Sequence, residues 1–122
     1  MAEQNLYKGR KGQKRLREIE ARISSLRESV DPLYADSREL ERIEQCFQDP
    51  LDKLYFFECV QCLDQIWSGI ENYGFLRLCV KWIRIRKLQQ LTRSDVDAML
   101  RDILPAKESA QVRKALADLP VM

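Results

Sequence analysis

The sequence predicts an all-α protein, a compact bundle of five to six helices with a flexible basic arm at its N-terminus. Two observations favour this fold class. Apolar residues recur every three or four positions along most of the chain, which is the period of a helix face. Glycine and proline number only four each in 122 residues, whereas a fold of many short strands needs more turn residues. We expect one helical domain over residues 14–122, preceded by the arm at residues 1–13.

The arm contains clustered charge and little apolar surface to bury, so it is predicted to be flexible. A first helix is predicted from about Gln13 to Ser29. Two interpretations of its apolar seam stay open: an ordinary amphipathic helix that packs within the monomer, or a self-association surface of a homo-oligomer. The seam residues have the spacing of a coiled coil, and they are Leu16, Ile19, Ile23, Leu26 and Val30.

A second helix follows the Asp31-Pro32 pair, which ends the first because a residue before proline avoids the α conformation. Asp36 and Glu39 have the spacing of a capping box, so the second helix is predicted to begin near residue 36 or 37.

A third helix is predicted from Pro50 to Glu71, because aspartate at position 49 suits an N-cap and proline suits the first helical position. Its apolar residues cover more than half of its circumference, which indicates a helix surrounded by others at the centre of the bundle. Asn72 and Gly74 are predicted to mark its C-terminal end.

Residues 75–91 are the ambiguous stretch. Apolar and polar residues alternate up to Trp82, as in a strand. The alternation then changes phase at Ile83 and Ile85, so a strand would place Arg84 on its apolar face. A helix removes this conflict, and no second strand candidate exists to pair with the segment. A fourth helix is therefore predicted.

Two short helices complete the predicted bundle. Thr92 and Asp95 have capping-box spacing, and the apolar residues from Val96 to Ile103 form one helical stripe. A last helix is predicted over residues 106–119. The pair is interpreted as a helical hairpin that closes the core, since the turn between them lacks the glycine usual in a helix-turn-helix.

The charge of the chain is segregated into two basic blocks. Residues 1–17 have a net charge of +5 and residues 75–93 a net charge of +6, although the whole chain has only +2. Such blocks are typical of proteins that bind polyanions. The first block contains Lys8, Arg10, Lys11, Lys14, Arg15 and Arg17. The second contains Arg93 and the five cations predicted to bind nucleic acid, namely Arg77, Lys81, Arg84, Arg86 and Lys87.

We expect a small non-enzymatic, homo-oligomeric protein that binds DNA or RNA through phosphate contacts, without reading sequence. In this interpretation Trp82 stacks on a base. An alternative keeps Trp82 in the core and pairs the second block with the glutamates of the second and third helices, namely Glu39, Glu41, Glu44 and Glu58. The protein would then be a helical adaptor or assembly subunit that docks another protein through apolar helix faces, or that binds an acidic protein surface.

Cys59 and Cys62 form a Cys-x-x-Cys pair, which is a metal or redox signature in some folds. Here the pair lies inside a predicted helix, so all four cysteines are interpreted as core residues. The alternative is a zinc site that also uses Cys46 and Cys79.

No catalytic motif and no cofactor motif are recognisable. The chain has no histidine, which excludes histidine-based acid–base catalysis and histidine metal ligands. No signal peptide or membrane-spanning segment is recognisable either. The expected location is therefore the cytoplasm or nucleus.

Overall fold

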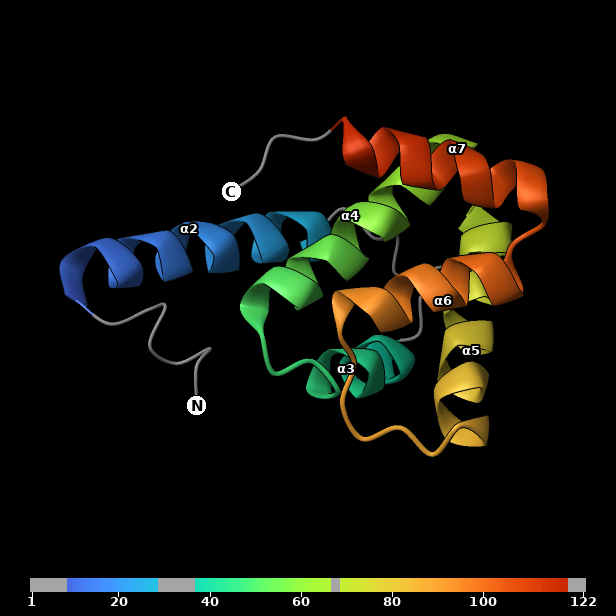
Figure 1. Cartoon of the computed structure of the whole chain (residues 1–122), viewed down its shortest axis with the longest axis horizontal. Coiled ribbons are helices and arrows are strands. Elements are labelled where there is room, and N and C mark those ends of the chain that lie inside the picture. Colours follow the sequence, from blue (N-terminus) through green and yellow to red (C-terminus); the bar gives the residue numbers. More distant parts are fainter. Residues whose placement is uncertain (1–8, 29–36, 67–68, 119–122) are drawn as a thin grey trace.

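The computed structural model describes residues 9–28, 37–66 and 69–118. Over these ranges the chain forms six helices and no strand, which confirms the all-α prediction. Figure 1 shows their arrangement. The helices are α2 (Gly9–Glu28), α3 (Ser37–Gln45), α4 (Pro50–Ile66), α5 (Gly69–Ile85), α6 (Arg93–Ile103) and α7 (Ala106–Ala117).

Helix α4 lies at the centre of the molecule, as predicted. It packs against α2, α5, α6 and α7, while α3 packs on α5 and α6 on α7. Phe56, Phe57 and Leu63 of α4 are fully buried. A helix that is apolar on most sides can exclude water only when other helices surround it. The α3–α4 and α5–α6 loops are joined to each other, because Leu91 donates a backbone hydrogen bond to the Cys46 carbonyl at 2.8 Å.

Two helix boundaries differ from the predictions. Helix α2 begins at Gly9, four residues before the predicted start near Gln13. The predicted third helix is two helices: α4 ends at Ile66, and α5 begins at Gly69. Asn72 and Gly74 therefore lie within α5 rather than at a helix end. Glycine disfavours a helix interior by only about 1 kcal/mol, and burial of the apolar residues that follow it outweighs this cost.

The ambiguous stretch is helical, but only as far as Ile85. The chain leaves α5 through a Schellman motif, in which Leu88 N–H donates to the Ile83 carbonyl and Lys87 N–H to the Arg84 carbonyl, both at 3.1 Å. Lys87 has a φ of 54°, the left-handed conformation that ends many helices. This motif explains why the helix stops six residues before the predicted end at Leu91.

The last two helices begin where the sequence predicts. Thr92 is the N-cap of α6, and its backbone N–H donates to the Asp95 carboxylate at 2.8 Å. Val96, Met99 and Leu100 of the predicted stripe are buried.

Candidate nucleic-acid interface

The first basic block forms the N-terminal half of α2. Residues 9–17 contain five cations and no acid, and each of these cationic side chains is exposed. The cations are Arg10, Lys11, Lys14, Arg15 and Arg17. Lys8, the remaining member of the predicted block, lies outside the described residues. Leu16 is the only large apolar side chain in this half of the helix, and it is half-buried.

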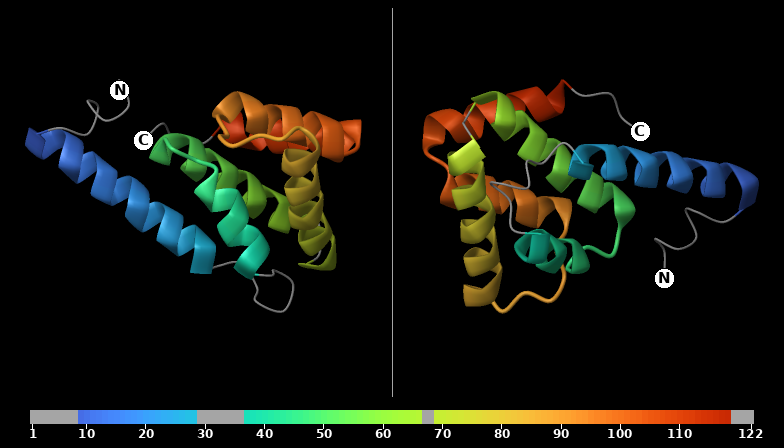
Figure 2. Two further views of the ribbon diagram at one scale, coloured as in Figure 1. Left: turned by 90° about the horizontal axis from the view of Figure 1, so that it is seen from below. Right: turned by 180° about the vertical axis from the view of Figure 1, so that it is seen from behind.

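This half of α2 extends beyond the other helices at one end of the molecule (Figures 1 and 2). Its first turn has no acidic residue, so Arg10 and Lys11 lie near the positive end of the helix dipole. Acidic residues or bound anions are favoured at that end, and cations are disfavoured there.

The second half of α2 has a different role. Ile19, Ile23 and Leu26 are buried inside the chain, and α2 packs on α4. The predicted self-association seam is thus covered within the monomer, so these side chains are not available to a second copy. The interpretation as an ordinary amphipathic helix is the one the structure shows. Leu16 packs at the edge of the same core, and Val30 lies outside the described residues.

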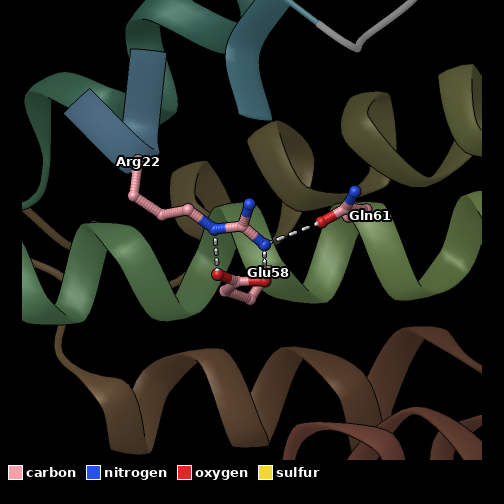
Figure 3. A network of polar contacts seen from close by, with 3 residues as sticks. All are labelled: Arg22, Glu58 and Gln61. Atoms are coloured by element: carbon pink, nitrogen blue, oxygen red, sulfur yellow. Dashed lines mark hydrogen bonds and ion pairs between the residues drawn. The ribbon is translucent and has the colours of Figure 1, made fainter. Parts of the chain in front are cut away.

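Polar contacts also hold α2 to the bundle. Arg22 Nε donates to Glu58 Oε1 of α4 at 2.9 Å, and a terminal nitrogen of Arg22 reaches Gln61 Oε1 at 3.4 Å (Figure 3). Arg27 pairs with Glu44 of α3 and lies over the Phe57 ring, 5.7 Å from its centroid. The anchored half of α2 therefore fixes the direction in which the basic half points.

The second basic block lies on α5 and in the turn that follows it. Arg77, Lys81 and Arg84 are exposed and share one side of the helix. Lys87 is exposed in the Schellman turn. No ion pair joins Lys81, Arg84 or Lys87 to another of the described residues.

The fifth cation of this block, Arg86, is held within the chain. Its guanidinium lies 4.1 Å from the Trp82 ring centroid and donates to Asp102 Oδ2 of α6 at 2.8 Å. Trp82 is only 7 % exposed, and its indole N–H donates to the same carboxylate oxygen at 2.9 Å. The prediction that Trp82 stacks on a base is wrong, because the ring is buried and is covered by Arg86.

Two of the four predicted internal partners of the second block are engaged elsewhere. Glu44 and Glu58 pair with arginines of α2, not with the cations of α5. The structure also separates the two blocks, because the basic half of α2 and helix α5 lie at opposite ends of the molecule (Figure 2). The two blocks therefore form separate surfaces.

Sequence reasoning missed two residues of the α5 surface. Leu78 and Ile85 are large apolar side chains that remain 48 % and 65 % exposed. The sequence contained a pattern that could have predicted this exposure. Leu78 and Ile85 are seven residues apart, so they share a helix face, and it differs from the face of Phe75, Cys79 and Trp82.

The cysteines behave as core residues. Cys59 and Cys79 are fully buried, while Cys46 and Cys62 are partly buried at the edge of the core. Burial raises the pKa of the Cys59 and Cys79 thiols. A neutral, buried thiol is a weak nucleophile.

Arg93, the last cation of the second basic block, packs against Tyr55. The Tyr55 hydroxyl donates to Asp97 Oδ1 at 2.6 Å, and the Arg93 guanidinium lies 4.3 Å from the tyrosine ring centroid. Burial, together with the hydrogen bond to Asp97, raises the pKa of Tyr55. These contacts join α4 to α6.

Within the described residues, no helix is both long enough and apolar enough to cross a lipid bilayer. Comparison of the chain with known protein families, curated proteins and solved structures gave no match.

Proposed function

We propose that the chain is a non-enzymatic nucleic-acid-binding protein of the cytoplasm or nucleus, with a regulatory or accessory role. The observation that carries the proposal is residues 9–17 of α2, where five exposed cations and no acid lie on a helix that extends beyond the bundle. This surface has almost no apolar area, so it offers a protein partner little to bury. It offers a phosphate backbone a dense set of charge-assisted contacts.

Phosphate contacts of this kind position a protein on nucleic acid without reading bases. At about 100° per residue, the cations of residues 9–17 span an arc of about 160° on one side of the helix, which suits contact with several phosphates along that side. The proposal includes both DNA and RNA as ligands.

The test compares two variants that each remove three positive charges. In the first, Lys11, Lys14 and Arg17 are changed to Gln; in the second, Arg77, Lys81 and Arg84 are. Affinity for labelled DNA and RNA, both duplex and single-stranded, is measured by fluorescence anisotropy at low salt. The α2 variant should bind about tenfold or more weakly than the α5 variant, because phosphate contacts are local. Equal losses would show that binding follows net charge alone and would overturn the assignment to α2. A wild-type chain that binds none of the four probes would overturn the function itself.

A second readout uses the helix dipole. Amide hydrogen exchange of residues 9–17 should slow when nucleic acid is added, because bound phosphates stabilise the positive end of α2. Exchange that stays unchanged in a saturated complex would contradict a contact at this helix.

A further inference from the structure

The outward face of α5 combines charge with exposed apolar side chains. At about 100° per residue, Arg77, Lys81 and Arg84 form one stripe, and Leu78 and Ile85 lie along its edge. Leu78 and Ile85 are separated by about 10 Å along the helix axis. They are the large apolar side chains that the described part of the chain leaves exposed. The opposite face of α5 is buried in the core, so α5 is well packed. The exposure of Leu78 and Ile85 is therefore not explained by poor packing of this helix.

This face is hollowed. One open hollow lies along α5, and the described residues of its lining, which include Leu78, Ile85 and the basic stripe, all come from this helix. A groove lies between α3 and α5, with Ile43, Ile83 and Leu88 in its wall. The hollow and the groove meet at Val80 and Arg84, which line both. Among the described residues, their linings contain five cations and no acidic residue; the cations are Arg42, Arg77, Lys81, Arg84 and Lys87.

Gly74 lies on the same face, near Lys81 and Ile85 in the helical projection. A Cβ atom added to Gly74 would meet nothing within 4 Å. Glycine lowers helix stability here without any requirement from the fold. Its effect is to leave the backbone of α5 open, and small residues at helix surfaces allow a second helix to approach closely.

We propose that this face docks an acidic amphipathic helix of a partner protein. Apolar residues of the partner would cover Leu78 and Ile85, and its flanking carboxylates would face the stripe of Arg77, Lys81 and Arg84. This is the helix-in-groove mode of recognition, which uses anchors spaced by helical turns. The charged side chains in the described part of the lining are all basic, and this charge complementarity favours an acidic partner.

Two other polyanions fit the surface less well. A nucleic acid backbone would gain nothing from Leu78 and Ile85, whose apolar side chains cannot contact phosphates favourably. A flat anionic membrane would leave the hollow and the groove unfilled. The docking site is independent of the nucleic-acid function, since the two surfaces lie at opposite ends of the molecule.

The test is a selection on the intact chain. A displayed library of short helical peptides is selected for binding to the wild type and counter-selected against a variant with Leu78→Ser and Ile85→Ser. Both side chains are exposed, so the variant should remain folded. Enriched peptides should carry apolar residues one and two turns apart, flanked by Asp or Glu. The double variant should bind a selected peptide about tenfold or more weakly, a difference of about 1.4 kcal/mol.

Charge and shape are tested separately. Lys81→Glu should weaken the acidic peptide and strengthen a matched peptide whose acids are replaced by lysine. Gly74→Gln fills the open space on α5 with a good helix former, so it should weaken binding without lowering the melting temperature. The α2 variant of the preceding section should bind the peptide as the wild type does.

The proposal would be overturned if the selection enriched no peptide over the double variant, or if the enriched peptides lacked acidic residues. Peptide binding that survives the double substitution would also overturn it. So would a result in which phosphatidylserine vesicles or duplex DNA, rather than peptide, bind through Leu78 and Ile85.

Discussion

Replacing Ile19 with alanine tests whether the seam of α2 belongs to the monomer. Ile19 is 0 % exposed and packs where α2 meets α4. The lost transfer energy is about 2.4 kcal/mol, at about 0.8 kcal/mol for each buried methylene. The cavity left behind raises the expected cost to about 3 kcal/mol, within the range of about 2–5 kcal/mol for such substitutions. A domain of this size has a stability of about 5–15 kcal/mol, so the variant should still fold.

Urea unfolding followed by circular dichroism measures this change. The matched control is Ile85→Ala, which removes the same atoms from an exposed site and should change stability by less than about 0.5 kcal/mol. Both midpoints should be independent of protein concentration, because the seam is closed within one chain. A midpoint that rises with concentration would show that association contributes to stability. That result, or an Ile19→Ala variant as stable as the control, would refute the reasoning.

Three further predictions concern the core and its edges. A double-mutant cycle on Arg22→Ala and Glu58→Ala should give a coupling energy of about 0.5–1 kcal/mol, because the pair is only partly buried. A coupling energy of zero would mean that this contact does not help to hold α2 against α4. Ser109 is buried in α7, and its hydroxyl has no hydrogen-bond partner among the described residues, so Ser109→Ala should raise stability by about 1 kcal/mol, and a lower melting temperature would contradict this. Burial raises the pKa of Cys59 and Cys79, so the folded state keeps protons that unfolded thiols lose above about pH 8.5. The free energy of unfolding should therefore fall as the pH rises past that value, and it should fall less steeply in Cys59→Ala than in the wild type.

Local signals in the sequence were sufficient for the last helices. Thr92, Asp95 and the stripe that begins at Val96 combine a start signal with one clear period, so they predict both the start and the buried face of α6. The centre of the bundle was equally predictable, because the composition of α4 requires neighbours on most sides.

Properties that depend on tertiary contacts were not predictable. The spacing of Ile19 and Ile23 shows that they are buried, but a heptad pattern is the same whether the partner is α4 or a second copy. The division between α4 and α5 is another example, since Gly74 signals a helix end only when burial of the following residues does not outweigh its low propensity.

The candidate site shows the same limit. Charge clustering revealed both basic blocks, but it did not reveal which cations make contacts within the chain. Arg86 resembles its neighbours in sequence, yet it binds Asp102 and covers Trp82. In the sequence, Glu44 and Glu58 could have been partners for the cations of α5, but the fold pairs them with arginines of α2. Partner choice depends on positions in space that short-range patterns do not encode.

The salt dependence of nucleic-acid affinity tests the central claim most directly. Each phosphate contact contributes a slope of about −0.9 to a log–log plot of affinity against salt for duplex DNA. If all five cations of residues 9–17 make contact, the slope of the full chain should be about −4.5. Changing Lys11, Lys14 and Arg17 to Gln should flatten it by about 2.7 units. A slope near zero for the wild type, or one that the three substitutions leave unchanged, would contradict phosphate binding by α2.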